Sequence, residues 1–285
     1  ILIPVYNDWQ SVFKLLENID LEVSRLEGEF SMIIVNDASS ESRPKFSAHL
    51  GSLKSIQIIN MKENRGHARC NAAGLKYINE NENFDHVIPM DGDGEDRPEE
   101  LNLLIKKIKD YPDLVVTANR VKRSEGFLFK FCYLSHKYLT LIFTGQTIKY
   151  GNYTCLPKSI VSELVNEPAT WNSFSGSLAK IAKNRKSISS ERGLRYFGPS
   201  KMSFVNLLKH SLSIVAVFKT ALLIRSVLFL IVYLFLMIGK ISVITVMPVI
   251  GVLIVMLSAI VLSKRENMSE FNSSLENIIS IDKVK

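Results

Sequence analysis

The sequence contains few cysteines, and their placement excludes two common kinds of scaffold. Among 285 residues there are three, Cys70, Cys132 and Cys155, which are far apart and odd in number. This pattern argues against a disulfide framework and a zinc cluster, and it fits a reducing, cytosolic setting. A basic leader is also missing. The chain opens inside the apolar run "ILIPVYN", so we find no signal peptide and expect a few residues to precede Ile1.

Two further absences argue against whole classes of function. No G-x-G-x-x-G follows any expected strand, which disfavours a dinucleotide-dependent dehydrogenase. The net charge is +7, yet the basic residues do not line one face with aromatic residues between them. We therefore expect no nucleic acid as a partner. We also find no internal repeat and no low-complexity linker.

The C-terminal third contains two long apolar runs. Residues 241–263 carry no charge, and at ~1.5 Å per residue they are long enough to cross a ~30 Å hydrocarbon core. Residues 221–239 form a second candidate, in which Arg225 must snorkel to the interface. The alternative is a buried core hairpin, and it is disfavoured because two such helices rarely fit inside a domain of this size.

Basic residues flank the pair of runs and predict its orientation. Lys209 and Lys219 precede the first run, Lys264 and Arg265 follow the second, and Lys240 alone lies between them. The positive-inside bias therefore places both flanking parts on the cytosolic side. We expect a globular domain, an amphipathic juxtamembrane helix, two transmembrane helices and a polar cytosolic tail, over residues 1–202, 203–220, 221–263 and 264–285. The apolar run 126–143 is interrupted by charges, and either an interfacial or a core helix stays open for it.

Short β-type runs alternate with amphipathic stretches in the N-terminal part. The runs are "ILIPV", "SMIIVND", "IQIINM", "HVIPMD" and "LVVTAN". This succession predicts an α/β, Rossmann-like fold with a mostly parallel central sheet flanked by helices. Ligands of such sheets gather at the carboxyl ends of the strands. Asn7, Asp37, Asn64 and Asp91 each follow an apolar run, so we expect one nucleotide-type crevice lined by all four.

The fourth of these runs leads into an acidic loop, "MDGDGEDRPEEL". Asp91 and Asp93 flank a glycine, so both carboxylates can converge on one hard cation. Mg²⁺ or Mn²⁺ fits, because such ions bridge a couple of carboxylates to phosphate oxygens. An EF-hand is excluded, since its obligatory glycine would be Asp96 and its last glutamate Asn102.

Four motifs occur in the order in which they occur in a known protein family. They are "IPVYND", "VNDASS", "ENRGHARCNAAGL" and "MDGDGEDRPEEL". Over residues 1 to about 210 the chain resembles family 2 glycosyltransferases, in the dolichol-phosphate mannose synthase-like and bacterial polyprenyl-phosphate glycosyltransferase branch. The resemblance implies the A-type glycosyltransferase fold and a nucleotide-diphosphate sugar as donor. The sequence leaves UDP- and GDP-linked sugars open.

The resemblance also implies a set of donor-site residues. Nucleotide-sugar binding falls to Pro4, Tyr6, Asn7, Asp8, Asp37, Ser39, Asn64, Gly66, Asn71 and Asp91. Asp91 and Asp93 match the metal motif and are the expected catalytic pair. Glu95 stands where relatives often carry glutamine, and it either adds a metal ligand or caps the following helix. Asn36 replaces the first acid of the D-D-x-S motif, and Asp8 replaces a glutamate.

A second motif predicts the acceptor site. "RGLRYFGPSK" matches the R-x-x-G-x-S-K signature of this branch through Arg195, Gly198, Ser200 and Lys201. Arginine, hydroxyl and ammonium groups suit a phosphate headgroup, and these residues lie just ahead of the apolar runs. Arg192 and Arg120 are further candidates for this phosphate, and Arg123 is a third. For Arg123 and Arg192 a solvated surface charge is the alternative.

Together these features predict a membrane-anchored, metal-dependent, inverting glycosyltransferase, a hexosyltransferase that acts on dolichyl or undecaprenyl phosphate. No E-D base motif follows Asn152, which disfavours a polysaccharide synthase. A transferase acting on a saccharide or glycolipid hydroxyl stays open, as does a non-catalytic membrane scaffold. We expect an integral membrane protein whose catalytic domain faces the cytosol, with the bacterial inner membrane favoured over the endoplasmic reticulum. A homo-oligomer stays open.

Overall fold

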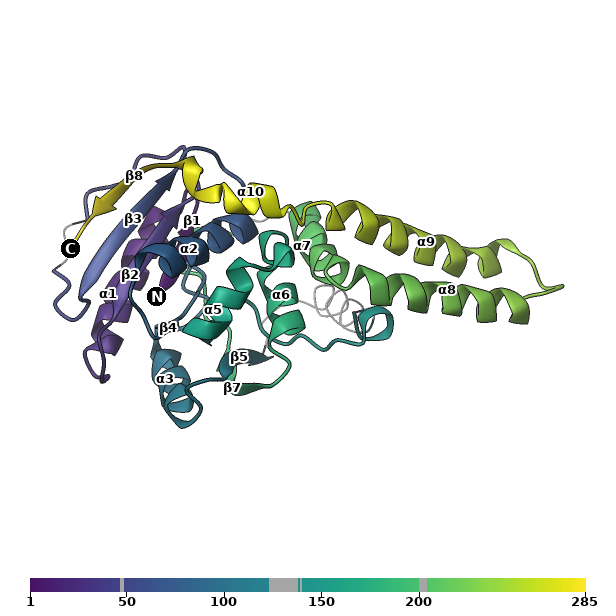
Figure 1. The fold of residues 1–285 in the computed structure, drawn as a ribbon, viewed down its shortest axis with the longest axis horizontal. Coiled ribbons are helices and arrows are strands. Elements are labelled where there is room, and N and C mark those ends of the chain that lie inside the picture. Colours follow the sequence, from purple (N-terminus) through teal and green to yellow (C-terminus); the bar gives the residue numbers. More distant parts are fainter. Residues whose placement is uncertain (47–48, 123–137, 139, 200–203) are drawn as a thin grey trace.

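The computed structural model describes residues 1–46, 49–122, 138, 140–199 and 204–285, which alternate between strands and helices much as the sequence predicts (Figure 1). The strands are β1 (Leu2–Val5), β2 (Ser31–Asn36), β3 (Ser55–Met61), β4 (His86–Val87), β5 (Val115–Lys122), β6 (Thr154–Pro157), β7 (Arg185–Glu191) and β8 (Ile278–Lys283). The α-helices are α1 (Trp9–Val23), α2 (His67–Asn81), α3 (Leu101–Asp110), α5 (Lys158–Val165), α6 (Phe174–Ile181), α7 (Phe204–Ala216), α8 (Lys219–Leu236), α9 (Val243–Ser263) and α10 (Met268–Asn272). The 3₁₀ turns are η1 (Pro98–Glu100), η2 (Pro168–Trp171) and η3 (Ser274–Asn277).

The strands form two four-stranded sheets that meet at β1. Their orders are β1-β2-β3-β8 and β4-β6-β5-β7, and a parallel bridge between Leu2 and Pro89 joins them. Pairing of β1 with β2 and of β2 with β3 is parallel, as predicted. Antiparallel pairs enter through β6 and β8, so the sheet is mixed. Because β1 and β2 run parallel, with the residues after β4 alongside them, their carboxyl ends share one edge, where a site can form.

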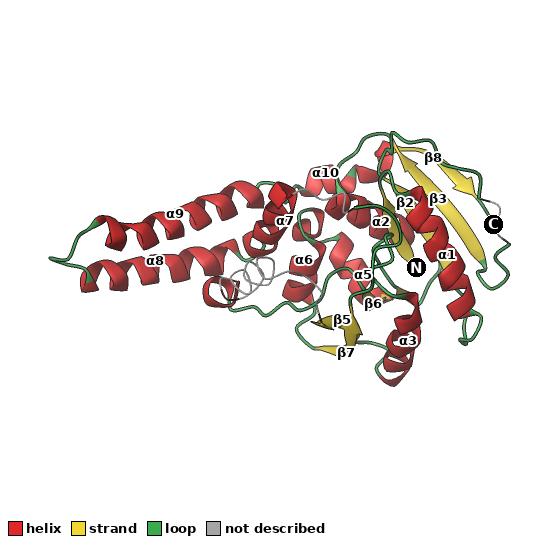
Figure 2. Ribbon diagram, turned by 180° about the vertical axis from the view of Figure 1, so that it is seen from behind, coloured by secondary structure: helices red, strands yellow, loops and turns green. Residues whose placement is uncertain are grey.

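Helices cover both faces of the sheet (Figure 2), and this explains why its strands read as unbroken apolar runs. Leu2 packs into the core beneath α2, α5 and α6, whereas Ile3 packs into the core beneath α1 and α3. All four residues of β1 are buried. The structure therefore confirms the α/β class with flanking helices.

Gly74 marks the closest approach of α2 to the sheet. A Cβ added there would lie 2.5 Å from Leu2 Cδ1 and 2.9 Å from Val35 Cγ2. We expect Gly74→Ala to destabilise the protein by about 1–3 kcal/mol, because this overpacking outweighs the gain in helix propensity. Chemical denaturation in detergent would measure it. Gly51→Ala is the control, since nothing lies within 4 Å of its added Cβ, and an unchanged midpoint for Gly74→Ala would contradict the packing argument.

The two apolar runs form a helical hairpin, α8 and α9, that projects from the globular part (Figure 1). Both helices are long and apolar enough to cross a membrane. Only 11% of the apolar stretch of each helix is buried, whereas a core helix is mostly buried. Helix α7 forms at their base, where the juxtamembrane helix was predicted. Arg225, the one charge inside the first run, donates to the carbonyls of Leu141 (3.4 Å) and Ile142 (3.1 Å). The end of a short helical segment thus accepts its hydrogen bonds. The rest of the run 126–143 falls largely outside the described residues.

Residues 264–285 differ from the predicted polar tail. They form α10, η3 and β8, and β8 pairs antiparallel with β3 (Figure 1). The backbone groups along the free edge of β3 offer this pairing to any extended segment that reaches them. Phe271 adds burial, as it is fully covered and stacks on Trp171 at 5.2 Å between ring centroids. The C-terminal segment therefore belongs to the globular domain.

Candidate active site

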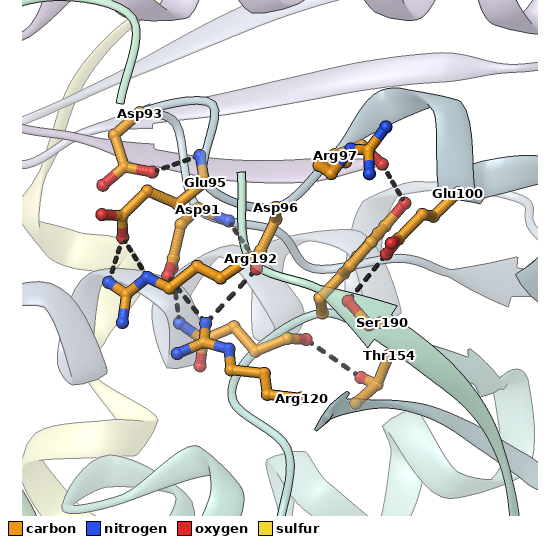
Figure 3. Close-up of polar contacts among 12 residues, drawn as sticks. Asp91, Asp93, Glu95, Asp96, Arg97, Glu100, Arg120, Thr154, Ser190 and Arg192 are labelled. Atoms are coloured by element: carbon orange, nitrogen blue, oxygen red, sulfur yellow. Dashed lines mark hydrogen bonds and ion pairs between the residues drawn. The ribbon is translucent and has the colours of Figure 1, made fainter. Parts of the chain in front are cut away.

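The acidic loop lies at the carboxyl edge of β1 and β4 and is closed on itself. The backbone N–H of Asp91 donates to Asp96 Oδ2 at 2.9 Å, and the N–H of Glu95 donates to Asp93 Oδ1 at 3.0 Å. Gly94 adopts a left-handed conformation with φ of 89°. Four carboxylates thus crowd into six residues, and Figure 3 shows arginine side chains pointing toward them.

Asp91 is held in its ionised form by its neighbours. Asn152 Nδ2 donates to Asp91 Oδ1 at 2.8 Å, His67 Nε2 lies 3.4 Å from the same oxygen, and Arg120 lies 3.9 Å from the other. Burial works to raise the pKa of Asp91, but His67, Arg120 and Asn152 outweigh it and hold the pKa below its ordinary value. Asp91 therefore presents a fixed negative charge.

The other aspartates of the loop show that negative charge is in excess. Burial and the charges of Asp91 and Glu95 raise the pKa of Asp93 to about 6. Burial and Asp91 raise the pKa of Asp96 to about 7, although Arg120 donates to it at 3.3 Å. A cation bound between these groups would relieve that repulsion.

Two arginines from the segment after β7 supply part of the missing positive charge. Arg195 Nη1 donates to Asp93 Oδ2 at 2.9 Å, and its other terminal nitrogen contacts Asp8. Arg192 Nε donates to Glu95 Oε2 at 2.8 Å (Figure 3). The predicted acceptor arginines and the predicted metal carboxylates therefore contact one another.

Backbone contacts fix this segment against the loop. The N–H of Gly193 donates to Glu95 O at 2.9 Å, and the N–H of Tyr196 donates to Asp93 O at 3.0 Å. A Cβ on Gly94 would lie 2.5 Å from the Tyr196 ring, so only glycine allows this approach. Upstream, the buried Glu100 carboxylate accepts from Ser190 Oγ at 2.7 Å and from the N–H of Glu191 at 2.9 Å, which holds the end of β7.

The predicted nucleoside side is built from the turns after β1, β2 and β3. Asp37 is buried, which raises its pKa, and its two oxygens accept from the N–H groups of Arg65 (3.0 Å) and Gly66 (2.9 Å). The N–H of Asn7 donates to Ser39 Oγ at 3.0 Å, and the N–H of Ser39 donates to Asn36 Oδ1. These bonds bring the three strand ends together, as the strand pattern predicts.

The remaining predicted donor residues vary in exposure. Pro4 lies within β1, Tyr6 is 44% exposed, and Asn64 is exposed in the turn after β3. Asn71 on α2 is fully buried, and within the described part of the chain its amide atoms have no hydrogen-bond partner. Ser200, Lys201 and Arg123 lie outside the described residues.

Two contacts of Asp91 were missed by the sequence analysis. His67 and Asn152 gave no signal, because neither belongs to a metal-type spacing and Asn152 is 61 residues from Asp91 along the chain. The sequence analysis used Asp96 only to exclude an EF-hand, whereas in the structure Asp96 closes the loop. No local pattern identifies such partners.

The donor set suits a hard divalent ion that takes most ligands from its substrate. In the part of the chain that the structure describes, no group of three or more histidine, cysteine or acidic side chains is placed to hold a metal. Asp91 and Asp93 offer two carboxylates, and Mg²⁺ or Mn²⁺ completes its shell with water and phosphate oxygens. The excess negative charge around Asp93 fits such an ion.

Comparison with curated proteins finds related transferases. Undecaprenyl-phosphate 4-deoxy-4-formamido-L-arabinose transferase of Proteus mirabilis (strain HI4320) is 26% identical over 214 residues, which cover 73% of this chain. The enzyme of the same name from Photorhabdus laumondii is 27% identical over 215 residues, again 73% of the chain. The chain spans 64% of the length of each relative.

Comparison with solved structures finds weaker similarity. The mannosyltransferase PcManGT of Pyrobaculum calidifontis, in complex with GDP-Man and Mn²⁺, covers 96% of this chain and 84% of its own, at 15% identity and a TM-score of 0.48. S. aureus TarS 1-349 covers 96% and 89% at 13% identity and a TM-score of 0.47. These scores leave the fold to be argued from the strands and helices themselves.

The family assignment comes from the sequence of the N-terminal part. The model of glycosyl transferase family 2 matches residues 1–158, more than half of the chain, and includes the acidic loop, Asp37 and Asn152. By this match, the chain belongs to glycosyl transferase family 2.

Proposed function

We propose that this protein transfers a sugar from a nucleotide-diphosphate donor to a polyprenyl phosphate at a membrane surface. One observation carries the proposal: Arg192 and Arg195 are joined to Glu95 and Asp93 at the carboxyl edge of the sheet. Cations suited to phosphate thus meet the carboxylates suited to a divalent ion in one place. The names of the two relatives, which are undecaprenyl-phosphate transferases, support the same acceptor class.

Each part of the site has a role in the proposed transfer. Asp91 and Asp93 would hold Mg²⁺ or Mn²⁺, which when bound neutralises charge on the departing diphosphate. The turns that carry Asn7, Asp37 and Ser39 would bind the nucleoside. Arg120, Arg192 and Arg195, with Ser200 and Lys201, would bind and orient the acceptor phosphate. Glu95 does not cap the following helix, since among the described residues neither η1 nor α3 has a side-chain cap. It would instead add a metal ligand or position Arg192, with which it pairs.

The proposed reaction needs no strong general base in the protein. A phosphate monoester has a second pKa of about 6, so its oxygen is already anionic near neutral pH. That oxygen would attack the anomeric carbon as the bond from this carbon to the diphosphate breaks, which inverts the configuration. Positioning and charge neutralisation by the arginines would supply most of the catalysis.

The helical hairpin would bring the site to the lipid. We propose that α8 and α9 span the membrane and that the globular domain lies on its cytosolic face, in bacteria the inner membrane. Lys219 at the start of α8 and Lys264 after α9 support this orientation. Because β8 returns to the sheet, both ends of the hairpin are tied to the same domain.

A transfer assay tests the proposal directly. The full chain in detergent is incubated with radiolabelled UDP- and GDP-sugars, with undecaprenyl phosphate or a saccharide as acceptor. We expect label in the polyprenyl phosphate only, with one of the two nucleotides, and its loss when EDTA removes the divalent ion. Label in the saccharide alone would favour a hydroxyl-directed transferase. The absence of both sugar transfer and nucleotide binding would favour a non-catalytic scaffold.

A further inference from the structure

We propose that the segment after the second apolar helix is part of the donor site, with Glu270 acting as a positioning residue for the turn between β3 and α2. The inference rests on the proposed function, since it concerns the binding of the nucleotide donor. The Glu270 carboxylate lies 2.9 Å from Arg65 Nη1 and 3.3 Å from Arg69 Nη2.

The turn held by Glu270 connects the two ends of the site. Its N–H groups at Arg65 and Gly66 donate to both oxygens of Asp37. The next residue, His67, begins α2 and lies 3.4 Å from Asp91 Oδ1. Gly66 itself has a φ of 88°, a conformation available to glycine that makes this sharp entry to the helix. A shift of this turn therefore moves groups at both Asp37 and Asp91.

The C-terminal segment, residues 264–285, is the returning segment, and it also holds this turn at its other end. The N–H of Lys62 donates to Asn277 O at 2.7 Å, and Asn277 Nδ2 donates to Glu63 O at 3.3 Å. Residues 62 to 66 are thus bounded by η3 on one side and by Glu270 on the other. The turn gains its conformation from a segment that lies more than 200 residues away along the chain, since Glu270 and Arg65 are separated by 205 residues.

The segment that carries Glu270 is itself rigidly anchored. Phe271 is fully buried and stacks on Trp171 at 5.2 Å, and the Arg69 guanidinium lies 5.4 Å from the centre of the Trp171 ring. The side chains of Glu270, Arg65 and Arg69 are 26%, 28% and 19% exposed, so water screens their ion pairs only in part. Glu270 contacts neither Asp37 nor Asp91, and its effect must pass through its partners Arg65 and Arg69.

Steady-state kinetics and nucleotide titration of the full chain test this role. We expect Glu270→Gln to raise the donor KM and the Kd of the bound nucleotide, UDP or GDP, about tenfold. We expect kcat, acceptor KM and melting temperature to stay near those of the unchanged protein, and Glu270→Asp to restore donor binding in part. Glu276→Gln is the matched control, because Glu276 is exposed on the same returning segment. Arg65→Gln should raise the donor KM as well, and the double variant should be no worse than the worse single variant.

The outcomes separate this inference from the proposed function. A donor KM unchanged in a folded Glu270→Gln protein overturns the positioning role and leaves the transferase intact. Equal rises in donor and acceptor KM together with a lowered melting temperature also overturn it, since they indicate a general loss of stability. If the unchanged protein neither binds UDP or GDP nor transfers sugar, the proposed function fails, and this inference fails with it.

Discussion

Asp91→Asn is expected to lower sugar transfer by about 100-fold or more. The substitution keeps the size of the side chain, and the amide oxygen can still accept from Asn152. It removes the negative charge of the carboxylate that His67, Arg120 and Asn152 keep ionised, and this carboxylate is the proposed ligand for a divalent ion. Radiolabelled transfer to undecaprenyl phosphate and calorimetric titration of Mn²⁺ in the presence of nucleotide measure the two losses.

The control for this variant is Asp110→Asn, which removes an exposed carboxylate at the end of α3. Transfer and Mn²⁺ affinity should stay unchanged in that protein. Both variants should unfold at similar temperatures, because Asp91 is stabilised by neighbours that remain in place. A folded Asp91→Asn protein with near-normal transfer would contradict the assignment of the metal site.

Arg195→Ala is expected to separate metal binding from acceptor binding. Arg195 neutralises Asp8 and Asp93, so its removal leaves these carboxylates free to attract a divalent ion. We therefore expect Mn²⁺ to bind at least as tightly as before. We expect the acceptor KM to rise by about 10- to 100-fold, because a phosphate loses a charged hydrogen-bond fork.

The measurement pairs Mn²⁺ titration with acceptor kinetics for Arg195→Ala and Arg195→Lys. Lysine keeps the charge but lacks the planar fork, so its acceptor KM should lie between the other two. Arg25→Ala, at an exposed residue just after α1, is the control. An unchanged acceptor KM combined with weaker Mn²⁺ binding would show that Arg195 only supports the acidic loop.

The residues at the strand ends show how much of the site can be predicted from local sequence. Asp37 and Asp91 follow apolar runs that are buried on both faces, and such runs read clearly as strands. Parallel strands bring their carboxyl ends to one edge, so the order of the motifs was enough to predict a shared crevice. Asp37 accepts hydrogen bonds from the N–H groups of Arg65 and Gly66, and the next residue, His67, lies 3.4 Å from Asp91 Oδ1, so these strand ends do meet.

The partners of these residues depend on contacts that no local pattern encodes. Arg195 and Asp93 are separated by 102 residues, and Arg192 and Glu95 by 97. The motif predicted Arg195 as a phosphate ligand, with Arg192 as a further candidate, but their pairing with the acidic loop depends on how β7 ends against Glu100 and on the space left by Gly94. Such geometry comes only from the packed chain.

The C-terminal segment is the clearest case of the same limit. Residues 264–285 read as a polar tail because their composition is polar and the long apolar helices before them dominate the pattern. A strand that pairs at a sheet edge gains most from backbone hydrogen bonds, which any side chains permit, so its partner strand is invisible in the sequence. Only the fold shows that β8 completes the sheet beside β3.

By itself, the sequence determined the α/β class and the apolar hairpin, because burial and helix length leave periodic traces in a chain, and it predicted the edge where the site lies and two acidic ligands there. The tertiary structure alone decided which charges meet. It paired Arg195 with Asp93, brought His67 and Asn152 to Asp91, and returned Glu270 to Arg65. Ion pairs and hydrogen bonds act over a few ångströms in space, whatever the distance along the chain, and folding sets those distances.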